Sequence, residues 1–471
     1  MAKKYNEVTP EILEQFKAIV PGKVYAGEEI NSDYFHDEMP IYGKGAPEVV
    51  IEATTTEDIA AIVKVCYENS IPVIPRGAGT GLTGAAVAVD GGVMIDMSKM
   101  NKILDYDLEN FVVRVEPGVL LNDLAEDVQK QGLLYPPDPG EKFATLGGNV
   151  STNAGGMRAV KYGCTRDYVR AMTVVLPTGE IVKLGATVSK TSTGYSLLNL
   201  MIGSEGTLCI LTEVTLKLMP APKFTRTLVM PFENLESCID MVPRLLQMAA
   251  VPTAIEFLER ELIDIVERNL HKLLPVKEGD AVLIVMYDAG SEQELLSACT
   301  EASDAALEAG AIDVYIADTP ERIASVWSVR GAILEGMKAE SVAQEECDVV
   351  VPRAKIAEYV RLAKSIGAKY GIRVEPCGHA GDGNIHTEML RDASMSDEDW
   401  IRGTRACLTE LYGVSKQFGG QLSGEHGIGN GRLEYLKPFV GDRMYKLYQS
   451  IKLAFDEKLI LNPGKIITFD E

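Results

Sequence analysis

The segment from Gly378 to His386 constrains the fold of this chain more than any other stretch. It reads Gly-His-Ala-Gly-Asp-Gly-Asn-Ile-His, and the residues on either side alternate between apolar and polar as strands do. Asp-Gly is the strongest two-residue hairpin signal, so Asp382 and Gly383 are predicted to form the turn. That register pairs His379 with His386, because directly opposed residues on antiparallel strands have Cβ atoms about 5 Å apart on one face. Two imidazoles at this separation can hold one divalent metal, so the sequence predicts a metal site.

The same segment also has a plainer interpretation, a glycine-rich hairpin with incidental histidines. The chain has only five histidines, and two of them lie here. A third, His426, follows Glu425 in the run Ser-Gly-Glu-His-Gly-Ile-Gly. Because so few histidines are present, their concentration in two glycine-rich runs favours the functional interpretation.

Length and composition limit the class of protein. At 471 residues the chain exceeds one ordinary core, so we expect two or three domains. The net charge of −22, from 46 basic and 68 acidic residues, argues against nucleic acid or an anionic membrane as a partner. No signal peptide or transmembrane run is visible, and the eight cysteines form no Cys-x-x-Cys pair. We therefore expect a cytoplasmic protein with free thiols.

A glycine loop between two predicted strands carries a literal Gly-x-Gly-x-x-Gly, at Gly79, Gly81 and Gly84. This is the dinucleotide fingerprint of the Rossmann fold, in which it has to open a crossover helix. The next predicted strand begins at Val93, so residues 85–92 leave no room for a helix of about a dozen residues. We therefore exclude the Rossmann fold and predict a bare loop whose amides can approach a pyrophosphate.

Three more glycine-rich loops follow, at residues 135–140, 144–156 and 202–210. Each loop alone has the composition of an ordinary surface turn. Glycine with Ser, Thr and Asn cannot supply a core, but it does supply backbone donors to a polar ligand. Four such loops within residues 76–210 indicate a long cofactor bound across loop ends.

Residues 225–415 have a different pattern, in which strands alternate with amphipathic helices. This pattern predicts an open α+β sheet with helices on one face. Arg330 lies in this region, in the run Ser-Val-Trp-Ser-Val-Arg. It is either a helix-surface charge or a bidentate clamp for a substrate carboxylate, and the sequence leaves these two interpretations even.

Six motifs, in order along nearly the whole chain, resemble one enzyme family. They are PRGAGTGLTGAA, YPPDPGEKFATLGGNVSTNAGG, IGSEGTLCI, GHAGDGNIH, SGEHGIG and LILNPGKI. Together they are similar to the FAD-dependent D-2-hydroxy-acid dehydrogenases, the group of glycolate oxidase large subunit, D-lactate dehydrogenase and D-2-hydroxyglutarate dehydrogenase. The resemblance implies the vanillyl-alcohol-oxidase (PCMH-type) fold. This is an α+β protein with an FAD-binding domain of two α+β subdomains and an α+β substrate (cap) domain with an open antiparallel sheet.

The resemblance also implies a division of the chain into four parts. These are an N-terminal helix and extension (1–45), a PCMH-type FAD-binding domain (46–222), a substrate or cap domain (223–423) and a C-terminal helical segment that returns to the FAD domain (424–471).

The resemblance implies a bound FAD, held mainly by residues of the first half of the chain. The residues that match the family's FAD contacts are Arg76, Gly77, Ala78, Gly79, Thr80, Gly81, Pro137, Asp138, Thr145, Gly147, Gly148, Asn149, Gly155, Gly156, Glu205, Gly206, Ile210 and Asn462. Relatives that bind flavin covalently often have a histidine where Thr80 stands, so the resemblance implies non-covalent FAD.

By the same resemblance, His379, His386 and Glu425 are similar to the metal ligands, and this ligand set suits Zn, Fe(II) or Mn. His426 is similar to the general base and Arg330 to the arginine that binds the substrate carboxylate. The family's reaction is oxidation of a D-2-hydroxy acid to the 2-oxo acid, with FAD as the acceptor.

One departure from the family bears on the substrate. D-2-hydroxyglutarate dehydrogenases have a lysine shortly before a Val-Pro motif, and here the matching run is Glu-Glu-Cys-Asp-Val-Val-Val-Pro, from Glu345 to Pro352. Acidic groups there would repel a second carboxylate. We therefore expect a small monocarboxylate, D-lactate first and glycolate second. A D-2-hydroxyglutarate dehydrogenase, a non-catalytic flavin relay subunit and a metal-dependent hydrolase stay open as alternatives.

The electron acceptor has no signature in the chain. With the nicotinamide fingerprint excluded and no iron–sulfur ligand pattern present, electrons have to leave FAD for another molecule. Some relatives use an electron-transfer flavoprotein, and we expect such a protein as the partner.

Overall fold

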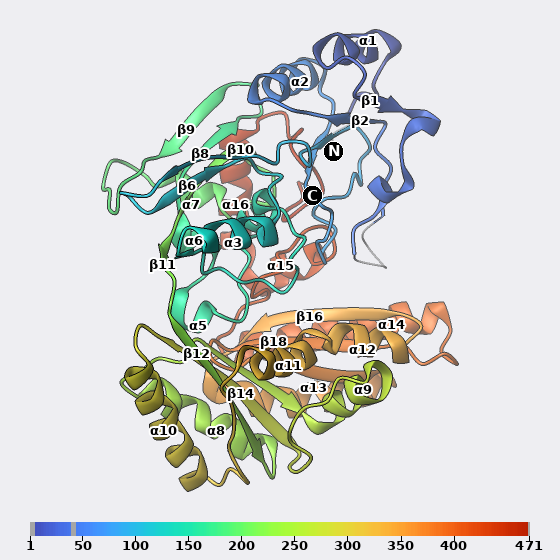
Figure 1. Cartoon of the computed structure of the whole chain (residues 1–471). Coiled ribbons are helices and arrows are strands. Elements are labelled where there is room, and N and C mark those ends of the chain that lie inside the picture. Colours follow the sequence, from blue (N-terminus) through green and yellow to red (C-terminus); the bar gives the residue numbers. More distant parts are fainter. Residues whose placement is uncertain (1–4, 39–43, 470–471) are drawn as a thin grey trace. The chain divides into compact units, whose positions relative to one another are not determined.

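The computed structural model describes residues 5–38 and 44–469 (Figure 1). The chain forms two units. The first consists of residues 1–154, 164–221 and 425–471, and the second of residues 155–163 and 222–424. The predicted N-terminal extension, 1–45, lies partly outside the described residues, because residues 1–4 and 39–43 are not described.

A four-stranded sheet and two helices form one half of the first unit. The sheet has the order β1-β2-β4-β3, with β2, β4 and β3 parallel and β1 antiparallel to β2. The strands are β1 (Val24–Ala26), β2 (Val49–Glu52), β3 (Val73–Arg76) and β4 (Val93–Asp96), and the helices are α1 (Pro10–Ile19) and α2 (Thr56–Asn69). Thr9 caps α1 and Pro10 opens it, because a proline at the first helical position loses no hydrogen bond. Both helices contribute side chains such as Phe16 and Ile59 to the core over the sheet.

A five-stranded antiparallel sheet forms the other half, in the order β5-β6-β10-β8-β9. Its strands are β5 (Ile103–Asp107), β6 (Val112–Val115), β8 (Val169–Val175), β9 (Ile181–Gly185) and β10 (Ile210–Lys217). The remaining elements of this unit are α3 (Leu121–Lys130), β7 (Leu133–Leu134), α4 (Leu146–Thr152), α6 (Thr165–Tyr168), α7 (Leu197–Met201), β11 (Met219–Pro220), α15 (Leu433–Val440), α16 (Asp442–Phe455) and the 3₁₀ turns η1 (Gly27–Glu29) and η2 (Ser32–Phe35).

The glycine loop after β3 is bare, as predicted. Residues 77–92 run from β3 to β4 without a helix. The exclusion of a Rossmann crossover is confirmed.

The second unit is built on one seven-stranded antiparallel sheet, in the order β15-β12-β14-β13-β17-β18-β16. The strands are β12 (Phe224–Phe232), β13 (Ala254–Glu259), β14 (Ala281–Ala289), β15 (Tyr315–Ala317), β16 (Gln344–Val350), β17 (Arg373–His379) and β18 (Asn384–Leu390). The helices are α5 (Ala159–Tyr162), α8 (Leu235–Leu246), α9 (Arg260–Leu270), α10 (Glu292–Glu308), α11 (Pro320–Gly331), α12 (Ile333–Glu340), η3 (Arg353–Lys355), α13 (Ile356–Tyr370) and α14 (Asp397–Gln417).

The prediction that helices cover one face of this sheet is wrong, because both faces are covered. Side chains of α9, α11 and α12 share a core with Leu258 and Cys377. On the other face, Tyr359 of α13 contacts the Cys347 thiol at 3.9 Å. Successive residues of a strand point to opposite faces, and strands with buried apolar residues on both sides, such as β14, therefore require two helical layers.

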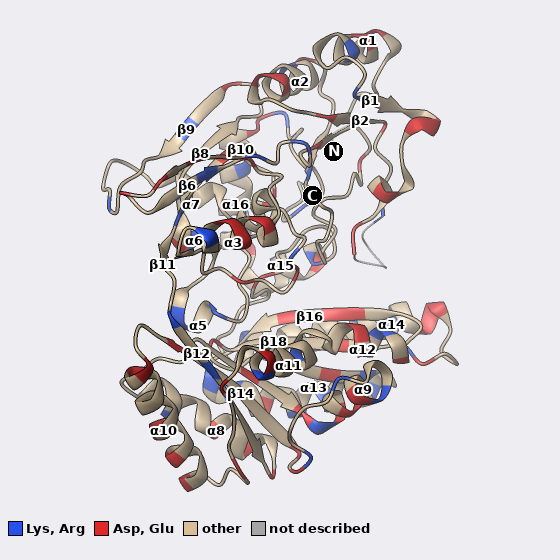
Figure 2. Cartoon of the chain, viewed as in Figure 1, with Lys and Arg blue, Asp and Glu red and all other residues tan. Residues whose placement is uncertain are grey.

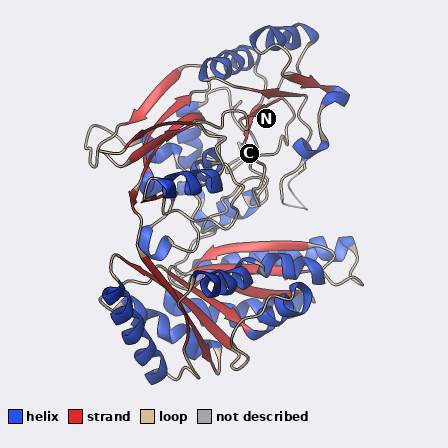
Figure 3. Cartoon of the chain, viewed as in Figure 1, coloured by secondary structure: helices blue, strands red, loops and turns tan. Residues whose placement is uncertain are grey.

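Helices and strands are mixed throughout each unit, so the fold class is α+β as predicted (Figure 3). Within the described residues, no helix combines the length and apolarity that crossing a bilayer requires.

Candidate active site

The hairpin predicted around Asp382 exists, but its register is wrong. Strands β17 and β18 pair His379 with Asn384 and Cys377 with His386, so the loop has four residues, 380–383, instead of two. The loop is wider because its backbone bonds to neighbouring segments: Gly383 accepts from Val351 at 2.9 Å. A Cβ at Gly383 would lie 2.1 Å from the Val351 carbonyl, so only glycine permits this approach.

The two imidazoles nevertheless lie side by side on one face of adjacent strands. His379 and His386 are diagonal neighbours, with ring centroids 5.2 Å apart, an interplanar angle of 89° and Nε2 atoms 3.4 Å apart. Glu256 lies 2.7 Å from Nδ1 of His379, and Glu346 lies 2.8 Å from Nδ1 of His386. A carboxylate can only accept a hydrogen bond, so the Nδ1 of each histidine donates one. In the resulting tautomer the lone pair of each ring is on Nε2, the atom that faces the other ring.

This donor set fits a divalent metal. Two ligand atoms about 2.05 Å from one ion at the tetrahedral angle are about 3.3 Å apart, close to the observed separation of the Nε2 atoms. A carboxylate behind each metal-binding imidazole is the arrangement that fixes its tautomer and raises its basicity. The two histidines therefore match a metal site both in spacing and in their supporting carboxylates.

The third predicted ligand, Glu425, directly follows a segment that is tied to β16. Asp348, which lies opposite His386 in the strand register, accepts from Ser423 Oγ at 2.8 Å and from the Gly424 amide at 2.9 Å. The same carboxylate accepts from Asn384 at 2.7 Å. The Glu425 carboxylate lies 3.7 Å from Nε2 of the next residue, His426.

Arg330, on α11, is a mostly buried partner of the same cluster. Its Nε donates to Glu256 at 2.8 Å, and the two side chains are 13% and 0% exposed. Burial alone would raise the pKa of Glu256, but the charge of Arg330 and the hydrogen bonds from His379 and Arg330 bring it below its ordinary value. Of the two interpretations left open by the sequence, the exposed helix-surface charge is excluded, because the side chain is only 13% exposed and donates to Glu256.

A row of carboxyl groups beside the histidines was not predicted. Glu346, Glu388 and Glu375 lie directly opposite one another on β16, β18 and β17, on the face that carries His386. Burial, and then the neighbouring Glu346 carboxylate, raises the pKa of Glu388 well above its ordinary value. Acidic residues colour much of β16 in Figure 2. The signal was in the sequence, since Glu388 follows His386 by two residues and strand alternation puts both on one face.

In the first unit, loops that contain predicted FAD contacts are joined to one another. The Asn462 Nδ2 donates to the carbonyls of Ala85, at 2.8 Å, and Glu205, at 2.7 Å. The Glu205 amide donates to Ser151 at 2.8 Å. A Cβ at Gly77 would lie 2.2 Å from the Thr145 hydroxyl, so the loop after β3 lies directly against the start of α4.

The polar atoms of these loops fit a large polar cofactor. Among the described residues, the buried Asn149 Nδ2 and Asn462 Oδ1 have no hydrogen-bond partner. Buried polar atoms are nearly always paired, so one acceptor and one donor are required from a bound molecule. FAD offers both along its pyrophosphate and flavin ring, and the residues present fit it.

The other predicted FAD residues occupy a range of positions. Arg76 ends β3 and donates to the Ala86 carbonyl at 3.2 Å. The loop after β3 contains Ala78, Gly79, Thr80 and Gly81. Thr145 caps α4, and that helix contains Gly147, Gly148 and Asn149. Gly206 lies just before β10, and Asp138, next to Pro137, forms an ion pair with Lys142. Ile210 is buried in the core of the first sheet. Gly155 and Gly156 fall in the segment that groups with the second unit, where Lys161 and Tyr162 bind Asp288.

Glu205 has a contact that the sequence did not indicate. Its carboxylate accepts from the backbone amides of Ile428 and Gly429, both at 2.7 Å, just after His426. Thr83 holds the same loop, through its hydroxyl to the His426 carbonyl at 3.3 Å. Burial raises the pKa of Glu205 to about 7, although the two amides oppose this shift. Glu205 therefore fixes the backbone that carries the predicted base.

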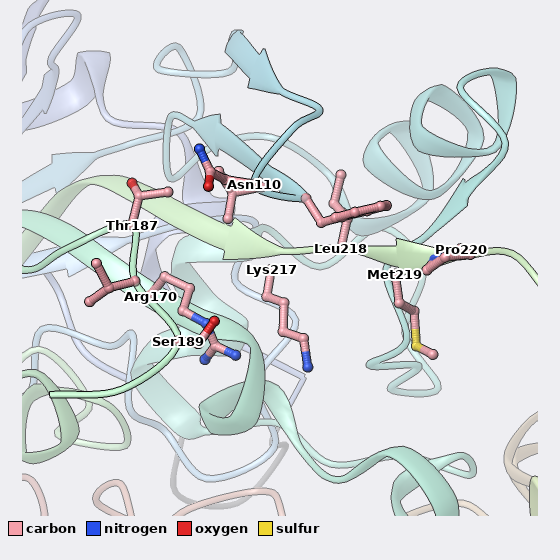
Figure 4. A pocket seen from close by; sticks show the side chains of 11 residues that line it. Asn110, Arg170, Thr187, Ser189, Lys217, Leu218, Met219 and Pro220 are labelled. Carbon is pink, nitrogen blue, oxygen red and sulfur yellow. The ribbon is translucent and has the colours of Figure 1, made fainter.

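A cavity of ≈ 290 Å³ in the first unit contains none of the predicted site residues. Figure 4 shows the side chains of Arg170 and Lys217 among those that line it. The full lining is Asn110, Phe111, Val112, Arg170, Thr187, Val188, Ser189, Lys217, Leu218, Met219 and Pro220.

Comparison with solved structures identifies the fold. The chain matches p-cresol methylhydroxylase with bound substrate at a TM-score of 0.81, with 20% identity over 99% of both chains. It matches an alkyldihydroxyacetonephosphate synthase at a TM-score of 0.74, with 19% identity over 98% of this chain and 87% of that one. The fold is that of the PCMH-type flavoproteins.

Comparison with sequence families and curated proteins identifies the family. Residues 47–185 match the FAD binding domain family, and residues 221–466 match the C-terminal domain of FAD linked oxidases. A D-lactate dehydrogenase of Anaerostipes hadrus is 57% identical over 98% of both chains. The glycolate oxidase subunit GlcD of Bacillus subtilis is 35% identical over 93% of this chain and 92% of its own. The chain belongs to the FAD-linked oxidase family, as a FAD-dependent hydroxy-acid dehydrogenase.

Proposed function

We propose that this protein oxidises a small D-2-hydroxy acid to the 2-oxo acid in a metal-dependent reaction, with D-lactate as the first choice of substrate and glycolate as the second. The names of the relatives support this substrate class. The observation that carries the proposal is the pair of Nε2 atoms of His379 and His386, 3.4 Å apart and each backed by a carboxylate.

Each site residue has a separate task in this proposal. His379, His386 and Glu425 hold one divalent metal, Zn, Fe or Mn, which supplies Lewis-acid chemistry to a coordinated hydroxyl and carboxylate. The anchoring of Gly424 by Asp348 supports the choice of Glu425, because Glu425 is the next residue of the chain. Bound FAD, held without a covalent bond, supplies the two-electron acceptor.

Proton removal and substrate orientation fall to His426 and Arg330. His426 takes the hydroxyl proton of the substrate on an imidazole nitrogen, a task that histidine performs most often among side chains. The Glu205 and Thr83 contacts to the following backbone support a fixed position for this base. Arg330 binds the substrate carboxylate and orients it, since a guanidinium matches a carboxylate in planar, bidentate fashion.

The Glu346 carboxylate favours a substrate with one carboxylate. Glu346 receives a hydrogen bond from His386, which stabilises its negative charge on the face that carries the histidines. A second carboxylate on the substrate would approach this charge and be repelled. We therefore propose that D-lactate and glycolate are favoured over D-2-hydroxyglutarate.

The remaining assignments are proposals of the same kind. Residues 46–222 bind FAD, residues 223–423 bind the substrate, and residues 1–45 and 424–471 complete the first of these domains. Electrons pass from FAD to a protein acceptor such as an electron-transfer flavoprotein, and the protein acts in the cytoplasm.

Anaerobic titration of the purified holoenzyme tests the function. We expect the flavin absorbance to bleach with D-lactate and, less completely, with glycolate, and to be unchanged by L-lactate. Faster bleaching by D-2-hydroxyglutarate would make that acid the substrate. If no hydroxy acid bleaches the flavin, the proposed oxidation is wrong, and an electron-relay role is tested by mixing the protein with a reduced electron-transfer flavoprotein. A preparation that lacks flavin absorbance would instead point to metal-dependent hydrolysis.

A further inference from the structure

Glu256 is a fully buried carboxylate that bonds to two residues of the proposed site at once. It lies in the middle of β13, in the run Ala254–Glu259, and is 0% exposed. One oxygen, Oε1, lies 2.7 Å from Nδ1 of His379, and the other, Oε2, accepts from Nε of Arg330 at 2.8 Å. Each oxygen therefore has its own donor, one on β17 and one on α11.

These two contacts determine which atoms of the partners face the site. With Nδ1 donating to Glu256, the lone pair of His379 is on Nε2, the atom that faces His386. The contact to Arg330 uses Nε instead of a terminal NH₂ group, and it holds the plane of the guanidinium. A carboxylate clamp needs that plane fixed, because bidentate recognition depends on the direction of two parallel N–H bonds.

The strand register explains why Glu256 can do this. Glu256 lies directly opposite His379 on the neighbouring strand, so both side chains stand on one face of the sheet. The other supporting carboxylate, Glu346, is hydrogen-bonded to His386, and its position on β16 is three strands away from β13 in the sheet order. Glu256 is therefore the carboxylate that connects the histidine pair to Arg330.

We propose that Glu256 is a positioning residue that orients the His379 imidazole for the metal and the Arg330 guanidinium for the substrate carboxylate. The proposal rests on the proposed function for the role of Arg330. It adds a single residue through which metal binding and substrate binding are linked.

The first test measures metal binding without turnover. Mn²⁺ binding to the FAD-loaded protein is followed by electron paramagnetic resonance for the wild type, Glu256→Gln and Glu256→Asp. Loss of a carboxylate behind a ligating histidine costs about 10- to 100-fold in metal affinity, and we expect this loss in Glu256→Gln. Glu256→Asp keeps the negative charge beside Arg330 and so protects the fold, but its shorter side chain cannot reach both donors, so we expect a loss there as well.

The second test measures the Michaelis constant for D-lactate in a double-mutant cycle of Glu256→Gln with Arg330→Ala. At saturating Mn²⁺, Glu256→Gln raises the Michaelis constant in the wild-type background if Glu256 acts through Arg330, but changes it less than about twofold when Arg330 is absent. If Glu256→Gln instead raises the Michaelis constant by the same factor with and without Arg330, its effect is a general structural one. The matching cycle with His379→Ala applies the same criterion to Mn²⁺ affinity.

Glu375→Gln is the matched control. Glu375 is also a buried carboxylate in this sheet, on β17, but its ion-pair partner is Arg373. We expect its Mn²⁺ affinity and Michaelis constant to stay near those of the wild type. The inference is overturned if Glu256→Gln and Glu256→Asp both retain wild-type values, or if Glu375→Gln shows equal losses. If no hydroxy acid bleaches the wild-type flavin, the proposed function fails, while the Mn²⁺ cycle still decides the role of Glu256 toward His379.

Discussion

Glu346 and Glu388 lie directly opposite each other on adjacent strands, on the face that carries His386. If the ionised Glu346 repels a second substrate carboxylate, Glu346→Gln raises the kcat/KM for D-malate relative to that for D-lactate, whereas Glu388→Gln changes this ratio less, because the raised pKa of Glu388 keeps its carboxyl protonated. Removal of one like-charge contact changes such a ratio by about tenfold, or about 1.4 kcal/mol. The ratio cancels any general loss from a disturbed His386. Glu375→Gln, the third member of the row, is the control, and an unchanged ratio in Glu346→Gln would exclude Glu346 as the selective element.

The general base is tested with His426→Ala. The flavin and the metal should stay bound, since the observed backbone contacts to Thr83 and Glu205 do not use the imidazole. Flavin reduction by D-lactate should slow by about 10²- to 10⁴-fold, the usual contribution of a positioned base. The measurement is anaerobic stopped-flow absorbance with parallel determination of FAD content. Reduction at the wild-type rate would assign the proton to another group.

Arg330→Lys tests the carboxylate clamp with charge retained. A lysine ammonium cannot reproduce the planar fork of a guanidinium, and it loses the Nε contact to Glu256. Hydrogen bonds to charged groups contribute about 1.5–3 kcal/mol, so the Michaelis constant for D-lactate should rise roughly 10- to 100-fold. Arg322→Lys, on an exposed part of the same helix, is the control. An unchanged Michaelis constant in Arg330→Lys would remove Arg330 from substrate binding.

The sequence predicted the sheet face of the histidines better than their register. Period-two alternation puts His379 and His386 on one face of adjacent strands under either pairing, and the structure confirms this. The register depends on the hydrogen bond that the Val351 amide, on a different segment, donates to the Gly383 carbonyl, and no local turn signal contains this contact. The glycine loops were predictable as loops because their composition excludes a core, and their mutual contacts through Asn462 required the fold.

The supporting carboxylates were beyond sequence reasoning for a similar reason. Glu256 precedes His379 by 123 residues, and its role follows from the pairing of β13 with β17. One hint was present in the residues around Glu256, since a glutamate flanked by apolar residues requires a partner once it is buried. Glu205 was predicted as a flavin contact from resemblance, whereas its visible bonds are to the backbone after His426.

Metal removal should separate flavin binding from turnover. Dialysis of the holoenzyme against a strong chelator should abolish bleaching by D-lactate and leave the flavin absorbance intact, because the FAD contacts and the histidine pair lie on different elements. Addition of Mn²⁺, Zn²⁺ or Fe²⁺ should restore bleaching, and the most effective ion identifies the metal. His379→Ala should not recover under any ion. Full activity after verified removal of every metal would refute metal dependence.

The pH dependence of stability should contain a contribution from Glu205. Its folded-state pKa of about 7 exceeds the ordinary carboxyl value of 4.5, so the folded protein binds a proton that the unfolded chain releases between these values. Its stabilising contribution is full below pH about 4.5 and is lost as the pH rises through about 7. Burial lowers the pKa of Lys465 to about 8. Lys465 is therefore mainly protonated in the folded and the unfolded protein below pH 7, and it adds little to the pH dependence of stability in this range.

The measurement is the unfolding free energy of the wild type minus that of Glu205→Gln, from urea titrations at saturating FAD between pH 5 and 7. Subtraction removes the groups that titrate equally in both proteins. Between pH 5 and 7 the difference should fall by about 2 kcal/mol, since one proton contributes at most about 1.4 kcal/mol per pH unit and binds only partly at the two ends of this range. A difference that is flat over this range would mean that Glu205 is already ionised at pH 5 in the folded protein. In that case the two amides of Ile428 and Gly429, bonded at 2.7 Å, stabilise its charge more than burial opposes it.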